Sequence, residues 1–95
     1  RSVSFFWCDN LLELTIESDV LTDFNLNVCV NFTSLNINSQ YLEQLKIGNV
    51  PKLTNLNKLP DHIESMYLDT CTNLSLISVS QIDFLECVNC PKLNY

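Results

Sequence analysis

The sequence predicts a mainly β repeat solenoid, in which short coils stack along one axis. An apolar template of the form L-x-L-x-x-C-x-x-L occurs five times at nearly constant spacing. Each interval between two copies carries a weaker second set of apolar residues, and helical spacing is never sustained beyond about two turns. A unit of two short strands cannot bury its own apolar face, so neighbouring copies must stack to enclose a common core.

The first segment of each coil carries the stricter half of the pattern. Stretches such as "FNLNV" alternate apolar and polar residues, which places every second side chain on one face of a strand. The template recurs with steps of 21, 21, 21 and 19 residues. Its copies are Val3, Phe5, Cys8, Leu11; Phe24, Leu26, Cys29, Phe32; Leu45, Ile47, Val50, Leu53; Met66, Leu68, Cys71, Leu74; and Leu85, Cys87, Cys90, Leu93.

The second segment of each coil follows a looser pattern. Lys58 stands where an apolar residue is expected in the third coil. Turns are expected at "DN", "NF", "VPK", "LPDH" and "CPK", where Pro, Asn and Asp interrupt the strands. The apolar residues of this segment are Leu14 and Ile16, Leu35 and Ile37, Leu56, and Ile77 and Val79.

The repeat defines one array of about 4.5 coils, over residues 2–22, 23–43, 44–64, 65–83 and 84–95. Solenoids need polar terminal caps, yet the first coil opens on apolar "VSFFWC" and the last stops before its second segment. We therefore expect the chain to be a fragment of a longer protein. Its end coils would then pack on the rest of that protein or on another subunit.

The composition is that of an acidic globular domain. Hydrophobic residues make up 46% of the 95 residues, and the net charge is −6. Nucleic acids and anionic lipids call for clustered Lys and Arg, so we expect neither as a partner. No segment approaches the roughly 18 unbroken apolar residues of a membrane helix, so no membrane insertion is expected. A single glycine excludes dinucleotide- and phosphate-binding loops, and no cofactor is expected.

Three segments match the signature L-x-x-L-x-L-x-x-N/C-x-L: "LEQLKIGNVPKL", "IESMYLDTCTNL" and "IDFLECVNCPKL". On these residues the chain resembles the leucine-rich repeat family. The length of about 21 residues and the stretch "LPDHIESMYL" are similar to the short bacterial-type repeats. The resemblance covers nearly the whole chain, although Val50 replaces the Asn or Cys of the signature in the third block.

This resemblance implies a parallel β-sheet along one side of the array and short extended segments or turns along the other. It also implies that the Asn or Cys after each strand turns inward and satisfies backbone groups at the bend. The residues at this place are Cys8, Cys29, Cys71 and Cys90. The similar stretches "NVPKL" and "NCPKL" are then the same turn on two coils, in which Pro removes an amide donor and fixes φ.

The cysteines invite a redox or metal interpretation, because Cys87-x-x-Cys90 has the spacing of such motifs. However, Cys90 falls on the inward position and Cys87 on a strand position equivalent to Ile47 and Leu68. We therefore expect both to be buried as small apolar side chains. With one His and the other cysteines spread one per coil, no metal site is expected. The odd number of cysteines favours free thiols and a reducing, cytosolic compartment, while secretion is not excluded.

Two further features of the sequence, the glycosylation sequons and the single histidine, do not indicate a functional site. The sequons at Asn31 and Asn73 occupy equivalent positions two coils apart, where the repeat itself requires an apolar residue between two polar ones. His62 is the only imidazole and has no nucleophile motif beside it, so we expect the chain not to be an enzyme.

The outward side chains of the main strands form the expected binding surface, because the exposed sheet face of an open repeat array is its usual contact surface. Aromatic residues beside charged ones are typical of the energetically dominant residues of protein interfaces. Alternatively, Phe6 and Trp7 belong to a terminal coil that another part of the protein covers. The expected face consists of Phe6, Trp7, Asn25, Asn27, Lys46, Tyr67, Asp69 and Glu86.

These observations favour a non-catalytic module that binds a protein partner through its exposed parallel sheet. One alternative is a structural spacer or tile that contacts its neighbours through end coils and edges. A third possibility, suggested by "LPDHIESMYL", is the substrate-recognition part of a bacterial effector whose enzyme domain lies outside the chain.

Overall fold

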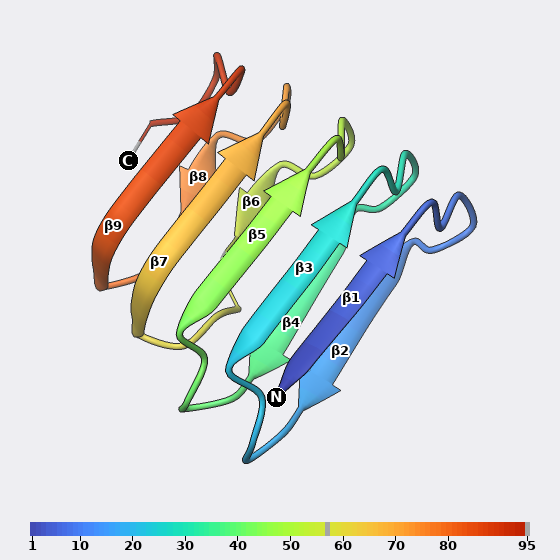
Figure 1. Ribbon diagram of the computed structural model, residues 1–95. Helices are drawn as coiled ribbons and strands as arrows, with labels where there is room; N and C mark the ends of the chain where they lie inside the picture. Colours follow the sequence, from blue (N-terminus) through green and yellow to red (C-terminus); the bar gives the residue numbers. More distant parts are fainter. Residues whose placement is uncertain (57, 95) are drawn as a thin grey trace.

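The computed structural model describes residues 1–56 and 58–94, and within them it contains strands but no helix. The chain winds into a parallel β-solenoid of about four stacked coils, as the repeat predicts (Figure 1). None of the described residues forms a helix long and apolar enough to cross a membrane.

One face of the solenoid is a five-stranded parallel sheet in the order β1-β3-β5-β7-β9. Neighbouring strands in this sheet come from successive coils, so one residue of each coil lies directly beside the equivalent residue of the next. The register step is 21 residues between the first four strands, as in Phe24↔Leu45, and 19 between the last two, as in Met66↔Leu85. The strands are Ser2–Phe6, Asp23–Asn27, Gln44–Gly48, His62–Asp69 and Gln81–Val88.

The inward side chains of these strands form continuous apolar rows. In the second coil Phe24 and Leu26 are fully buried, while the alternate residues Asp23, Asn25 and Asn27 face outward. The same alternation recurs in every coil, so inward apolar side chains stack on the equivalent side chains of the next coil. Together they form one core along the whole axis. Leu45, Ile47, Met66 and Leu68 continue the two central rows with at most 2% exposure.

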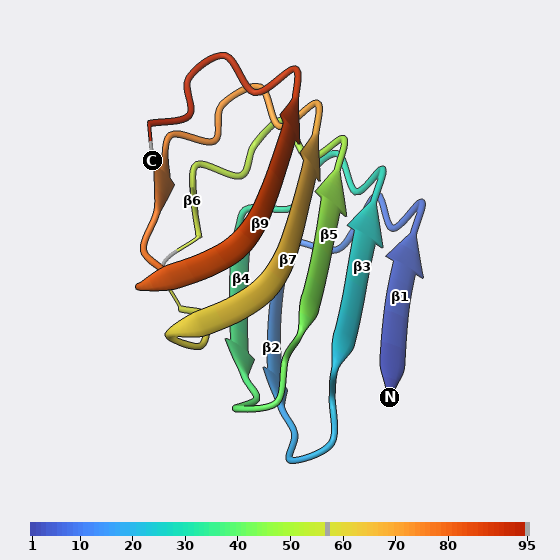
Figure 2. The same cartoon turned by 60° about the vertical axis from the view of Figure 1, so that its left-hand side comes forward.

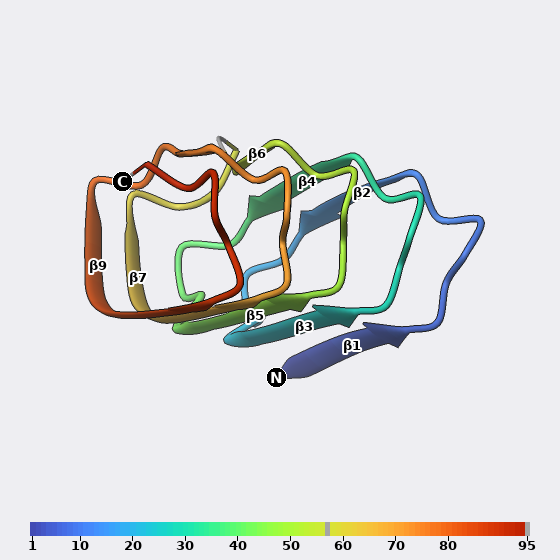
Figure 3. The same ribbon diagram turned by 90° about the horizontal axis from the view of Figure 1, so that it is seen from above.

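The opposite side of the solenoid is less regular (Figure 3). Strands β2 (Glu13–Glu17) and β4 (Ser34–Asn38) pair in parallel over five residues, whereas β6 (Asn55–Leu56) and β8 (Leu76–Ile77) pair over only two. The break falls at the third coil, where Lys58 replaces the buried Ile37 of the second. Lys58 is exposed there, because a charged side chain is not buried in an apolar core without a partner.

The coils also close differently at the end where the main strands begin. The loops after β2 and β4 extend below the sheet, whereas β7 and β9 curve across that end of the solenoid (Figure 2). These two strands are eight residues long instead of five, because they include the crossing segment. The end of the solenoid at which the main strands begin is therefore closed by loops in the first two coils and by the strands themselves in the last two.

Each coil bends after its main strand at a residue with a left-handed backbone. The φ angles of these residues lie between 54° and 60°. The N–H groups of the first four still donate to the last strand carbonyl of the next coil, as from Val28 to Gly48 at 3.1 Å and from Thr70 to Val88 at 2.8 Å. The interstrand ladder thus holds the strained bend in place. The five residues are Trp7, Val28, Asn49, Thr70 and Asn89.

A four-residue turn follows each bend. It confirms that the stretches "NVPKL" and "NCPKL" are the same turn on two coils. The N–H of Leu53 donates to the Val50 carbonyl and that of Leu93 to the Cys90 carbonyl, each at 3.2 Å. Pro51 therefore occupies the second position of its turn, where its fixed φ is favourable.

The sequon asparagines lie at these turns and connect neighbouring coils. Asn31 Nδ2 donates to the Asp9 carbonyl at 2.8 Å, and its Oδ1 accepts from Lys52 Nζ at 2.8 Å. Asn73 repeats the arrangement two coils later, donating to the Pro51 carbonyl and accepting from Lys92. Both amides therefore have a structural role in the stacking.

The two end coils are open on one side, and this corrects one expectation. Cys87 was expected to be buried like Ile47 and Leu68, but it is exposed, and Cys90 is only partly buried. The expectation assumed a neighbour on both sides of each coil, whereas no strand among the described residues stacks on the outer side of β9. For the same reason the inward residues of the first coil, among them Val3 and Phe5, are only half-buried.

Relieving the strain at a bend is expected to stabilise the fold. Val28 is β-branched and has a φ of 58°, a conformation that costs an L-residue about 1–2 kcal/mol. Val28→Asn introduces the residue found at two other bends and should raise the free energy of unfolding by about 1 kcal/mol. The reverse change at an exposed bend, Asn89→Val, should lower it by a similar amount. Urea denaturation measures both, and a stabilising Asn89→Val would contradict this account.

Neighbouring residues of β7 are expected to respond oppositely to polar substitution. Leu68→Asp places an unpaired carboxylate at a position with 1% exposure and should cost several kcal/mol, about 3 or more. Tyr67→Ser removes an outward side chain and should cost about 1 kcal/mol or less. Thermal denaturation followed by circular dichroism measures the difference. Equal losses of stability in the two variants would show that the inward and outward faces of β7 have been assigned wrongly.

Candidate protein-binding face

The outer face of the five-stranded sheet carries the predicted surface residues in two rows. The pairing Asn25↔Lys46↔Tyr67↔Glu86 forms the central row. Phe6, Asn27 and Asp69 lie in the row next to it, together with Gly48 and Val88. Seven of the eight predicted residues thus share this face, and Trp7 is the exception.

An aromatic cluster stands at the C-terminal end of the face. The rings of Tyr67 and Phe84 are 5.7 Å apart between centroids and tilted by 54°. Lys46 Nζ lies 5.4 Å from the centre of the Tyr67 ring, which is within the range of a cation–π contact. Phe84 remains 50% exposed and Val88 46% exposed. This cluster is therefore an apolar patch with a positive charge at its edge.

Phe84 was missed in the sequence analysis. Only the positions between and directly after the two inward residues of each strand were considered there. Phe84 stands one position before Leu85, in register with Gln44 and Ser65 on the same face. The alternation of strand side chains, extended by one residue towards the N-terminus, would have identified it.

Phe6 and Trp7 lie at the other end of the sheet and do not join this cluster. Three strand spacings separate Phe6 from the β7 row, or about 14 Å at roughly 4.8 Å per strand. Trp7 follows β1 at the bend, with a φ of 60° and 74% exposure, and so lies beyond the strand face where it was predicted. The predicted aromatics therefore form two separate groups.

The only glycine of the chain serves close packing within this face. A Cβ built on Gly48 would lie 2.8 Å from the Asn27 side-chain nitrogen. That space lets the Asn27 amide stand between the second and third coils, where its Oδ1 accepts a hydrogen bond from Asn49 Nδ2 at 2.9 Å. Gly48 has no left-handed φ, so its role here is space and not backbone freedom.

The ends of four main strands are capped by the thiols of Cys8, Cys29, Cys71 and Cys90. Each thiol donates to the carbonyl two residues before it, as from Cys8 to Phe6 and from Cys90 to Val88, both at 3.4 Å. The corresponding Cys29 and Cys71 contacts are 3.7 Å. All of the cysteines have free thiols. These residues stabilise the bend below the candidate face and do not contribute to its surface.

Burial suppresses the reactivity of the central cysteines. Desolvation, with a smaller contribution from Cys90, raises the pKa of the Cys71 thiol to about 12. Burial also raises the pKa of Cys29, and desolvation followed by the proximity of Cys90 raises that of Cys87. Among the described residues, no three His, Cys, Asp or Glu side chains gather in a way that could hold a metal ion.

Comparison with protein-family models, with curated proteins and with solved structures finds no match for this chain. The parallel solenoid with its spacing of about 21 residues is compatible with a repeat protein. The fold and the geometry of the face thus rest on the chain's own repeat and pairing.

The raised pKa of Cys71 predicts a loss of stability in alkaline solution. Above the ordinary thiol pKa of 9.0 the unfolded chain releases this proton, while the folded chain keeps it up to about pH 12. The contribution of Cys71 is therefore fully present below pH 9 and falls as pH rises from 9 to 12. Cys71→Val, which copies Val50 in the third coil, should flatten this decline in urea denaturation. Parallel pH profiles for the two proteins would contradict the assignment.

Proposed function

We propose that this chain is a short leucine-rich repeat array that binds a protein partner through the outer face of its five-stranded sheet. The observation that carries the proposal is the cluster of Lys46, Tyr67 and Phe84 on that face. Protein interfaces are enriched in aromatic residues and depleted in charge at their centres. A half-exposed Phe beside a Tyr and a cation meets that description better than any other part of the face.

The neighbourhood of the cluster supports the same proposal. Asp69 and Glu86 flank Tyr67 and Phe84 on adjacent register positions, which gives the apolar centre a polar rim. The strands below are fixed by the buried rows of Met66 and Leu68, so the cluster is carried on a rigid scaffold. A preformed aromatic patch loses little conformational freedom when it binds.

A second candidate function, a spacer or tile within a larger assembly, is favoured by the open ends of the solenoid. The inward residues Phe5 and Leu14 of the first coil and Leu85 and Leu93 of the last are only half-buried. The outer edges of β1 and β9 have no strand beside them among the described residues. Contacts made through these ends would not involve the outer face of the sheet.

Affinity capture with matched variants tests the proposal. Tyr67→Ser combined with Phe84→Ser should reduce the captured amount of one specific protein by about tenfold or more, as expected when interface aromatics are truncated. Leu12→Ser combined with Leu76→Ser removes two exposed apolar residues that lie outside this face and should leave capture unchanged. Both variants must first be shown to melt like the wild type.

Two results would overturn the sheet-face proposal. Equal losses with both double variants would indicate non-specific apolar contact. Unchanged capture with the Tyr67 and Phe84 variant, but loss after substitution of half-buried end-coil residues, would favour the spacer.

A further inference from the structure

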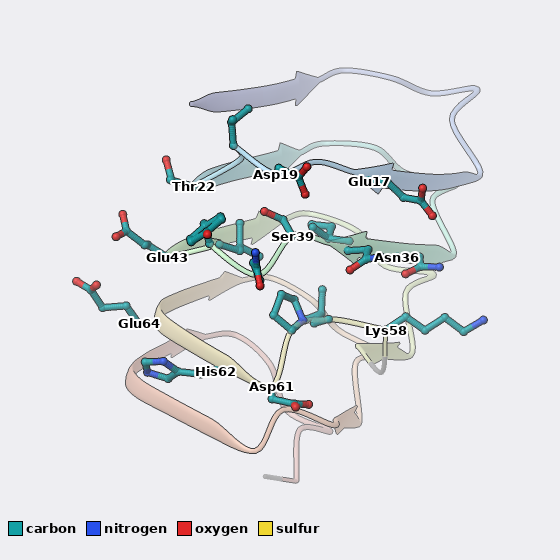
Figure 4. Close-up of a pocket in the computed structure, with 18 of the residues that line it drawn as sticks. Glu17, Asp19, Thr22, Asn36, Ser39, Glu43, Lys58, Asp61, His62 and Glu64 are labelled. Atoms are coloured by element: carbon teal, nitrogen blue, oxygen red, sulfur yellow. The ribbon is translucent and has the colours of Figure 1, made fainter.

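A groove with a volume of about 1080 Å³ lies beside the loops that close the second and third coils (Figure 4). Its lining contains none of the eight residues predicted for the sheet face. One wall is built from the β4 residues Asn36 and Asn38 and the loop that follows them. The rest of the lining comes from residues between Thr15 and Thr22 in the first coil and between Lys58 and Glu64 in the third. The groove is therefore separate from the candidate protein-binding face.

The groove originates at the irregular position noted in the sequence. In the third coil Lys58 keeps one backbone contact to β4, through its carbonyl to the Ile37 N–H at 2.9 Å. The chain then continues through Leu59 and Pro60 into β7, which begins at His62. Beyond Lys58 the described part of the chain forms no further backbone hydrogen bond to β4, and the space beside Asn38 and the loop after it is open.

The charge of the groove is strongly one-sided. Its lining contains five carboxylates but only one lysine. In Figure 4 the Lys58 side chain extends away from Glu43 and Glu64. None of the five carboxylates forms an ion pair with another described residue, since the ion pair present joins His62 to Asp83. The carboxylates are Glu17, Asp19, Glu43, Asp61 and Glu64.

Two of these carboxylates oppose each other across neighbouring coils. Glu43 and Glu64 occupy equivalent positions, because Gln44 pairs with Ser65 and the Ser65 N–H donates to the Glu43 carbonyl at 2.9 Å. Like charges at directly opposed strand positions are destabilising. A cationic ligand would relieve this repulsion, and the concave shape concentrates the negative potential there.

The uncharged part of the lining fits a peptide better than a simple cation. Val20 and Tyr41 are 57% and 55% exposed and line the groove together with Leu59 and Pro60. An exposed tyrosine ring beside carboxylates suits a guanidinium, which stacks on aromatic rings and donates two parallel hydrogen bonds to a carboxylate. The amide side chains of Asn36 and Asn38 add hydrogen-bonding groups along the same wall.

We propose that this groove binds an extended peptide segment that carries arginine side chains, with small apolar or polar residues between them. Charge complementarity identifies the occupant: the carboxylates pair with the guanidinium groups, and Tyr41 and Val20 contact the intervening residues. The proposal is independent of the sheet-face function, since the two surfaces share none of the proposed contact residues.

Fluorescence anisotropy with a labelled, blocked hexapeptide of sequence Arg-Thr-Arg-Val-Arg-Thr tests the proposal. The groove variant combines Glu43→Gln with Asp61→Asn and should weaken saturable binding about tenfold or more, as expected on loss of charge-assisted contacts. The control combines Asp9→Asn with Glu13→Gln, which changes the net charge equally outside the groove lining. It should weaken binding less than about twofold. The Tyr67 and Phe84 variant should bind the peptide like the wild type.

The same assay contains the results that would overturn the proposal. Equal weakening by the groove and control variants would show attraction to overall negative charge alone. Equal affinity for a peptide with citrulline in place of arginine would exclude guanidinium recognition. Binding of spermine as tightly as the peptide would indicate a site for diffuse cations, and absence of saturable peptide binding would also refute the proposal. Thermal melting of each variant shows that none of these results reflects unfolding.

Discussion

The structure depends on in-register stacking of coils that cannot bury their own apolar faces. Phe24 lies beside Leu45, and Leu45 beside Met66, so each core side chain packs on its equivalents above and below. The same register places backbone donors opposite acceptors in every coil. A coil with only one neighbour loses half of these contacts, which explains why Val3 and Leu85 are half-buried while their equivalents are buried.

This stacking also holds conformations that a single coil would not adopt. Val28 and Thr70 have left-handed backbones at a bend, although both are β-branched. Their N–H groups complete the ladder to the next coil, and the cysteine that follows each of them donates its thiol to a strand-end carbonyl. The contacts between coils therefore offset the local strain, and the bend repeats with the same period as the core.

The sequence predicted the period, the direction of the side chains and the turns, because these depend on a pattern repeated in every coil. It was less informative where one coil differs from the others. Cys87 occupies the same position in the repeat as Leu68, but no described strand stacks on its outer side. Its equivalence to a buried residue therefore did not make it buried. Phe84 and Trp7 were misjudged because a strand's ends are less well defined by the pattern than its centre.

The groove shows how a departure from the repeat creates a distinct surface. Lys58 was recognised as an irregular residue, but its consequence depends on where the chain goes next. Up to Lys58 the third coil lies beside β4, but the chain then turns through Leu59 and Pro60 into β7 and leaves the wall of Asn36, Asn38 and the following loop open. The carboxylates of adjacent loops surround this open space. A regular solenoid exposes uniform ladders, so a site with its own shape and charge requires a break of this kind.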